Sequence, residues 1–279
     1  MGKTTGEDTS SAPLRFGPPK GGYFGRSRTP LHVLVFLLPL IIFYEIGSAI
    51  WLAGSDGALA QDIRARRIIA QLFDSFGIYG VYLPGILILV VLLIWHVLTR
   101  DPWRVRLKTV GGMWVEALVW TVPLLVLGQL LYRLLIGNGA PTVVGAGPEL
   151  IALSGDAISG HSMGARATIS IGAGLYEELL FRMVAIAIIH LLLVDVGGLK
   201  SSTGTIAAVV ISSAMFAVYH DVGVLPGGPN SIQWAELVFF FAAGLYFGAL
   251  YIARGFGIVA GVHALYDLAV LVVIPGTTG

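Results

Sequence analysis

Seven long apolar runs occupy most of this chain after residue 30, and they constrain its fold more than any other feature. They are residues 31–52, 78–98, 113–136, 167–194, 204–225, 232–252 and 256–274. A bilayer core takes roughly 20 apolar residues to cross as an α-helix, and lipid offers the backbone no hydrogen-bond partners, so such runs cross as helices. We therefore expect an all-α polytopic membrane bundle with about seven to eight transmembrane helices.

The composition agrees with a membrane-embedded chain. Of 279 residues, 56% are hydrophobic and only 12% are charged, too few to cover the surface of a soluble globule of this size. Cysteine is absent, which excludes disulfides and thiolate chemistry. The net charge of +1 indicates no nucleic-acid partner, and no feature of the sequence predicts an oligomeric state.

The domain organisation follows from the difference between a polar N-terminal segment and the apolar remainder of the chain. Residues 1–30 are rich in Gly, Pro, Ser and Thr with scattered basic residues, which predicts a disordered basic tail rather than a cleavable signal peptide. Residues 31–279 form a single membrane-embedded helical domain. Within it, residues 58–76 mix charged and apolar side chains, typical of an amphipathic helix lying on the membrane.

The distribution of Lys and Arg predicts the orientation. The tail and the loop 100–108 carry the most basic residues, whereas the loop 137–166 has none before its last position. The positive-inside rule then places the N-terminus in the cytoplasm of a multi-pass protein of the cell membrane. The loop 137–166 is too polar and too broken to span, and an eighth hidden crossing elsewhere would reverse the orientation of all that follows it.

The apolar run 167–194 contains three charges, Glu177, Glu178 and Arg182. Each ionisable group at the bilayer centre costs at least about 2.5 kcal/mol, so such a cluster is a functional-site hypothesis by default. Glu178 and Arg182 are four residues apart and share a helix face, whereas Glu177 is rotated by about 100°. The alternative is that both acids only neutralise Arg182 and fix helix packing, although a structural pair needs one acid and here there are two.

Two later runs carry histidines, His220 after Phe216 and His263 before Asp267, each pair four residues apart. A carboxylate and an imidazole from separate helices can share a water, remove its proton and direct it at a carbonyl. A second imidazole could stabilise the resulting oxyanion. Zinc binding by these groups is a further alternative, but the chain has no His-Glu-x-x-His helix, so we expect neither a metal nor another cofactor.

Three other polar residues in apolar runs, Glu45, His96 and His190, fit an interior structural role better. A single carboxylate on a first span can pair with a distant basic group, and a lone His near a span end is more often a satisfied interior residue. We place none of the three in the site.

The ordered motifs over residues 165–275 resemble a known family. The segment 177–182 resembles the EExxxR motif of the CAAX-processing and bacteriocin-processing (CPBP, or Abi) intramembrane proteases. The segment 216–220 is similar to their FxxxH element, and 263–267 to their HxxxN or HxxxD element. The glycine-marked run 241–248 resembles the helix between these elements. The N-terminal half matches only as generic spans.

The resemblance implies a glutamate-type endopeptidase that hydrolyses a peptide bond in a membrane-associated peptide or protein. By that resemblance Glu177 and His220 activate the water, Glu178 and Arg182 brace the site, and His263 with residue 267 forms the oxyanion side. Better-understood members have Asn where this chain has Asp267. An ionised Asp cannot donate a hydrogen bond, so Asp267 would act protonated or would instead orient His263.

Two rival functions remain. The first is a non-catalytic membrane interaction or immunity protein whose buried Glu/Arg/His cluster is structural. The second is a proton-coupled carrier, for which the chain lacks an internal repeat and paired broken helices.

Overall fold

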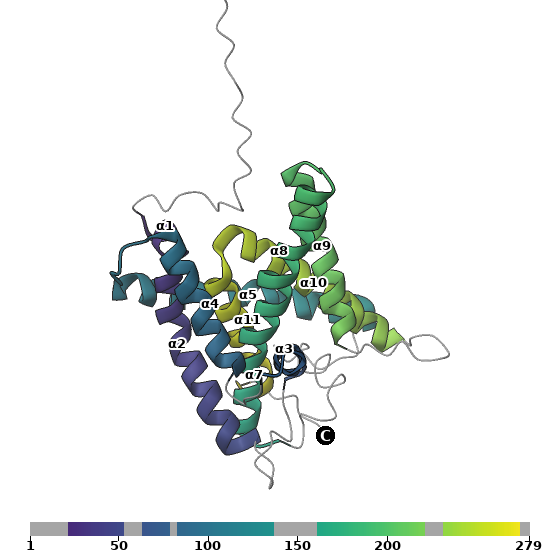
Figure 1. The fold of residues 1–279 in the computed structure, drawn as a ribbon. Coiled ribbons are helices and arrows are strands. Elements are labelled where there is room, and N and C mark those ends of the chain that lie inside the picture. Colours follow the sequence, from purple (N-terminus) through teal and green to yellow (C-terminus); the bar gives the residue numbers. More distant parts are fainter. Residues whose placement is uncertain (1–21, 53–62, 79–82, 137–160, 221–230, 274–279) are drawn as a thin grey trace, which may run out of the picture.

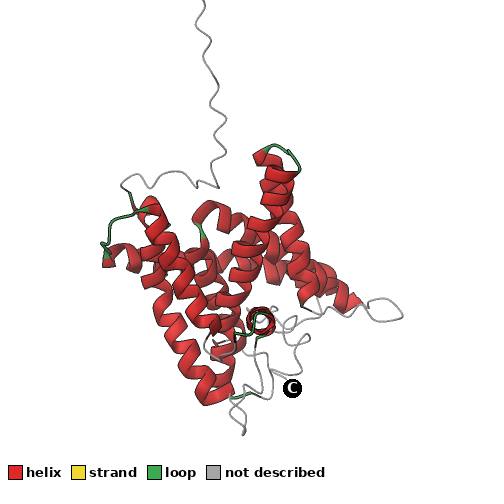
Figure 2. Cartoon of the chain, in the orientation of Figure 1, coloured by secondary structure: helices red, strands yellow, loops and turns green. Residues whose placement is uncertain are grey.

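The computed structural model describes residues 22–52, 63–78, 83–136, 161–220 and 231–273, and every regular element among them is a helix (Figures 1 and 2). Several long helices stand side by side as a bundle, as expected for an all-α fold. The helices are α1 Tyr23–Arg26, α2 Pro30–Gly47, η1 Ser48–Leu52, α3 Arg64–Ser75, α4 Leu83–Thr99, α5 Leu107–Ile136, α7 Met163–Glu178, η2 Leu179–Ala185, α8 Ile186–His190, η3 Leu191–Val196, α9 Ser201–Tyr219, α10 Ser231–Arg254, α11 Phe256–Leu268 and η4 Ala269–Val273.

The helices match the predicted spans closely. Among the described residues, six helices are long and apolar enough to cross a membrane, and a shorter apolar helix over Gly85–Thr99 corresponds to the predicted second span. The polytopic helical membrane bundle is therefore confirmed. Residues 137–160, most of the loop that was predicted not to span, lie outside the described residues.

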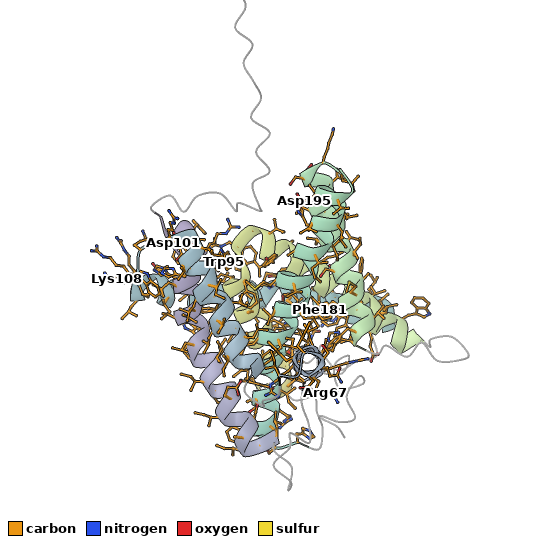
Figure 3. All side chains as sticks on the ribbon, in the orientation of Figure 1. Arg67, Trp95, Asp101, Lys108, Phe181 and Asp195 are labelled. Carbon is orange, nitrogen blue, oxygen red and sulfur yellow. The ribbon has the colours of Figure 1, made fainter. Side chains whose placement is uncertain are left out.

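The surface of the bundle is apolar where a soluble protein would be polar. Many large hydrophobic side chains on the spanning helices are exposed, among them Ile42, Ile94, Val119 and Leu192. Charged side chains such as Asp101, Lys108 and Asp195 project near one end of the bundle (Figure 3). Because lipid tails solvate apolar side chains, this surface suits a bilayer.

The segment predicted as an amphipathic surface helix contains α3. In Figure 1 its axis runs across the long helices, and it packs against α7 and α4. It buries Ala65, Arg66 and Ile69 and exposes Arg64 and Arg67, which is the two-faced pattern of an amphipathic helix. The structure thus brings α3 beside the helix that carries the two glutamates.

Residues 22–29, which lie at the end of the predicted basic tail, are ordered and include α1. The Tyr23 hydroxyl donates to Glu116 Oε2 at 2.6 Å. Burial and that carboxylate raise the pKa of Tyr23 well above its usual range. Glu116 also pairs with Arg254, whose Nη2 donates to Ser27 Oγ at 2.8 Å. These contacts tie the start of the chain to α5 and α10; residues 1–21 lie outside the described residues.

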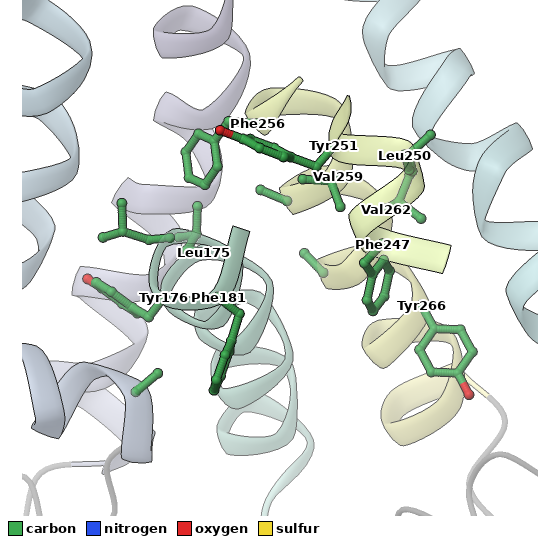
Figure 4. Packing of buried hydrophobic residues seen from close by; sticks show 14 of the residues in the cluster. Leu175, Tyr176, Phe181, Phe247, Leu250, Tyr251, Phe256, Val259, Val262 and Tyr266 are labelled. Atoms are coloured by element: carbon green, nitrogen blue, oxygen red, sulfur yellow. The ribbon is translucent and has the colours of Figure 1, made fainter. Parts of the chain in front are cut away.

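The centre of the bundle is the contact between α7 and α11, the most extensive of any described pair of elements. The chain enters α11 through Gly255, whose φ of +85° is a left-handed conformation that glycine adopts without strain. Aromatic side chains such as Phe181, Phe247 and Phe256 fill the surrounding core (Figure 4). The two central helices therefore have little freedom to shift.

Gly174 lets α7 and α11 approach, and we expect Gly174→Ala to reduce the yield of folded protein. A Cβ there would lie 2.5 Å from the backbone nitrogen of Ala264 and 2.8 Å from the Ala260 carbonyl oxygen. Backbone atoms cannot yield as a side chain can, so overpacking of about 1–3 kcal/mol is expected. The thermal unfolding midpoint in detergent measures this loss of stability. Gly111→Ala is the control, since a Cβ at Gly111 meets nothing within 4 Å, and equal unfolding temperatures in the two variants would contradict the expectation.

Candidate active site

The two glutamates lie at the point where α7 changes its winding. Ser162 caps the start of α7 by accepting from the Ala165 backbone N–H at 3.2 Å. Directly after Glu178 the helix becomes the π-helical segment η2. A π-turn alters the regular backbone hydrogen-bond pattern and is frequent at functional sites. Here the Ser212 hydroxyl donates to the Phe181 carbonyl oxygen at 2.6 Å, so α9 helps to stabilise the segment.

Glu178 and Arg182 form the expected pair across this turn. Arg182 Nε lies 3.1 Å from Glu178 Oε2, and both side chains are almost completely buried, with exposures of 1% and 0%. The N–H does not point at Oε2, so the contact is an ion pair without hydrogen-bond geometry. Arg182 Nη2 donates to the Gly244 carbonyl oxygen at 3.4 Å, and the guanidinium lies 4.3 Å from the Phe216 ring centroid. Arg182 thus joins three helices.

Glu177 faces the two histidines, as expected from their cost in lipid. Glu177 Oε2 lies 3.6 Å from His220 Nε2 and 4.0 Å from His263 Nε2, and it has no hydrogen-bond partner among the described residues. Its other oxygen, Oε1, accepts from the Tyr219 hydroxyl at 3.4 Å. One carboxylate oxygen is therefore held by Tyr219, and the other points into the space between the imidazoles.

His220 has a defined tautomer. It follows the last residue of α9, and its Nδ1 donates to the Phe216 carbonyl oxygen at 2.8 Å. Since Nδ1 carries the proton, Nε2 of the neutral ring presents a lone pair towards Glu177. The ring stacks on Phe240 of α10, with centroids 4.0 Å apart and planes 15° apart. Two helices therefore fix the orientation of this imidazole.

His263 lies between carboxylates. Its Nδ1 donates to Glu178 Oε1 at 2.7 Å, and its Nε2 lies 3.5 Å from Asp267 Oδ2. The ring stacks on Phe247, with centroids 4.6 Å apart. Both ring nitrogens face acceptors, so the protonated ring, which donates from both, is well accommodated. Asp267 engages His263 rather than projecting alone into the site.

Glu177, both histidines and Asp267 line one partly open cavity of about 260 Å³. Its polar lining residues come from α3, α7, the C-terminal end of α9 and α11, and its remaining wall is apolar. The lining residues are Arg64, Leu124, Ile169, Ala173, Glu177, Phe216, Tyr219, His220, Phe239, Phe240, Ala243, Phe247, His263, Tyr266, Asp267 and Leu271.

Several lining residues were not identified from the sequence. Phe240 and Phe247 are seven apart on α10, a spacing that places them on one helix face, but only the structure shows an imidazole stacked on each. Tyr219 directly precedes His220, and that adjacency was the available signal. Arg64 belongs to the amphipathic helix α3, and no local pattern links it to a site on α7.

The three polar residues that the sequence analysis left outside the site make contacts elsewhere. Glu45 accepts from the Tyr176 hydroxyl at 3.2 Å. His190 Nε2 lies 3.5 Å from Ser201 Oγ, and the His96 ring contacts Trp103 edge-on. None of the three lines the cavity.

In the described part of the chain, no group of three or more His, Cys, Asp or Glu side chains is arranged to hold a metal ion. The Nδ1 atoms of both site histidines are occupied by protein acceptors. What the arrangement offers chemically is a carboxylate oxygen and a basic imidazole nitrogen that face one site, with a second imidazole beside them.

Comparison with known families finds a match over the part of the chain that contains these groups. Residues 160–269 match the family model described as type II CAAX prenyl endopeptidase Rce1-like. No curated protein and no solved structure matches the chain. The matched region contains both glutamates, Arg182, both histidines and Asp267. This multi-pass membrane protein is thus similar over residues 160–269 to the Rce1-like CAAX prenyl endopeptidases, which confirms the family resemblance carried by the sequence motifs.

Proposed function

We propose that the protein is a metal-independent, glutamate-type intramembrane endopeptidase that hydrolyses a peptide bond with a water activated by Glu177 and His220. The observation that carries the proposal is the position of Glu177 Oε2, buried in the cavity and facing Nε2 of both His220 and His263.

The pairing of Glu177 with His220 suits a water molecule. Carboxylate Oε2 and the unprotonated Nε2 of His220 are both acceptors, so they cannot hydrogen-bond each other directly. A water between them can donate one hydrogen to each. As its oxygen attacks the scissile carbonyl carbon, Glu177 takes the proton and later delivers it to the departing amine nitrogen.

His263 is suited to the opposite side of the reaction. A protonated imidazole donates to the carbonyl oxygen as negative charge develops there, and such stabilisation is usually a large part of catalysis. Asp267 then acts as the group that orients His263, because its Oδ2 lies 3.5 Å from His263 Nε2. This assignment needs no protonated Asp267.

Glu178 and Arg182 act as a brace. Glu178 accepts from His263 Nδ1 through one oxygen and contacts Arg182 through the other. The carboxylate therefore fixes the ring that faces the substrate while Arg182 offsets its charge. Since a 1 Å displacement of a catalytic group can reduce rates strongly, this rigidity contributes to turnover.

The substrate class follows from the cavity and the family match. Apart from the catalytic groups and Arg64, the wall is aromatic and aliphatic, and most of it is formed by the spanning helices. Together with the matched family description, this supports a prenylated C-terminal peptide delivered from a membrane, with the N-terminus of the protein in the cytoplasm. A lipid-anchored peptide meets such a site without leaving the bilayer.

We expect purified protein in detergent to cleave a quenched prenylated peptide equally well with and without excess chelator. The proposed base is a carboxylate and the proposed oxyanion donor is an imidazole, so no step of this mechanism requires a metal. Appearance of the cleaved peptide over time measures the effect. The unprenylated peptide serves as the control for the substrate class. Activity that is lost on chelation and restored by zinc would replace this mechanism with a metal-assisted one.

A further inference from the structure

The Tyr266 hydroxyl is a buried donor that the proposed chemistry does not use. Tyr266 lies on α11 one turn after His263 and is 3% exposed. Its ring approaches Phe239 of α10, with centroids 6.3 Å apart. Among the described residues its hydroxyl oxygen has no hydrogen-bond partner. Buried hydroxyls are normally satisfied, so this one calls for a partner from elsewhere.

Tyr266 lines the same cavity as Glu177 and the two histidines. The same lining includes Leu124, Ile169, Phe239 and Leu271, whose side chains offer no acceptor. The neighbouring carboxylate of Asp267 is directed at His263 instead. Since the described residues supply no acceptor for the Tyr266 hydroxyl, a molecule that occupies the cavity can supply one.

A peptide substrate brings such acceptors. Each of its backbone carbonyls needs a donor once water is excluded, and few of the cavity side chains can donate. Tyr219 already donates to Glu177 Oε1, and the proposed mechanism assigns His263 to the carbonyl oxygen of the bond that is cleaved. Tyr266 is thus a donor of the inner wall without another engagement.

We propose that Tyr266 is a substrate-binding residue whose phenolic O–H donates a hydrogen bond to a backbone carbonyl oxygen of the peptide in the cavity. The inference rests on the proposed peptidase function and adds a specific contact to it. It predicts that the hydroxyl contributes to substrate binding but not to the stability of the unliganded fold.

The test is Tyr266→Phe, which removes only the hydroxyl. In full-length protein carrying Glu177→Gln to prevent turnover, we expect the Kd for a fluorescent prenylated peptide to rise about tenfold, the size of one neutral hydrogen bond. The thermal unfolding midpoint should stay unchanged or rise, because the variant removes a buried donor that lacks a partner. In the active protein, kcat/KM should fall by a similar factor.

Tyr176→Phe is the matched control. The Tyr176 hydroxyl donates to Glu45 and lies outside the cavity lining, so its loss should lower the unfolding midpoint and leave the Kd unchanged. An unchanged Kd in Tyr266→Phe, or a midpoint that falls as in Tyr176→Phe, would overturn the inference while the peptidase proposal stands. If the wild-type protein neither binds nor cleaves the peptide, the proposed function fails, and this inference fails with it.

Discussion

Replacing Glu177 with Gln is expected to lower peptide cleavage per folded molecule by about 100-fold or more while leaving the fold intact. Gln keeps the size of the side chain and an oxygen that can accept from Tyr219, but it cannot take a proton from water. The expectation applies to Glu177 because its Oε2 has no hydrogen-bond partner among the described residues and faces His220. Single-turnover cleavage, normalised to the folded fraction from gel filtration, is the measurement.

Glu45→Gln is the control for this result. Glu45 is also a carboxylate on a spanning helix, but it accepts from Tyr176 and does not line the cavity, so specific activity should stay near that of the wild type. The specific activity of His220→Ala should fall as that of Glu177→Gln does, since the two groups are proposed to hold one water. Unchanged specific activity in Glu177→Gln would remove Glu177 from the mechanism and favour a structural role for the cluster.

The largest effect on stability is expected from Arg182→Ala, at about 3–5 kcal/mol. Glu178 is completely buried, and removing Arg182 leaves only His263 to offset that carboxylate in a medium of low dielectric constant. The variant also loses the hydrogen bond to the Gly244 carbonyl and the contacts of the guanidinium with Phe216 and Phe247. Folded yield and the thermal midpoint in detergent measure the loss.

A double variant separates charge from packing. Arg182→Met together with Glu178→Gln removes both charges, keeps comparable volume and leaves an acceptor for His263, so it should recover much of the stability lost in Arg182→Ala. Recovery of stability without recovery of activity would match a bracing role. Wild-type stability in Arg182→Ala would show instead that the pair contributes little to the stability of the fold, which would contradict the bracing role.

The sequence alone determined the secondary structure and class of this protein. In lipid a chain must satisfy its backbone hydrogen bonds locally, so each apolar run of sufficient length reports a helix without reference to its neighbours. The helices α9, α10 and α11 accordingly lie close to the predicted residues 204–225, 232–252 and 256–274. The pairing of Glu178 with Arg182 was predictable for the same reason, because a spacing of four residues is a local property.

Arg254 shows that the residues next to a charge in the sequence do not identify its partner. In the sequence it lies between the predicted spans 232–252 and 256–274, where a basic residue indicates the orientation of a loop in the membrane. In the structure it is buried and paired with Glu116, 138 residues away. The partner of a charge depends on which helices are neighbours, and no spacing along the chain encodes that.

The features of the site also divide into those predictable from the sequence and those decided by tertiary structure. The high cost of charges in lipid was enough to expect Glu177, His220 and His263 to converge, because isolated groups would be unstable there. Tertiary structure alone decided the rest: the π-turn after Glu178, the stacking of His220 on Phe240 and of His263 on Phe247, and the positions of Arg64 and Tyr266. These features arise from contacts between helices, whose side chains meet only after the bundle has packed, so their physical cause lies outside any local segment of the sequence.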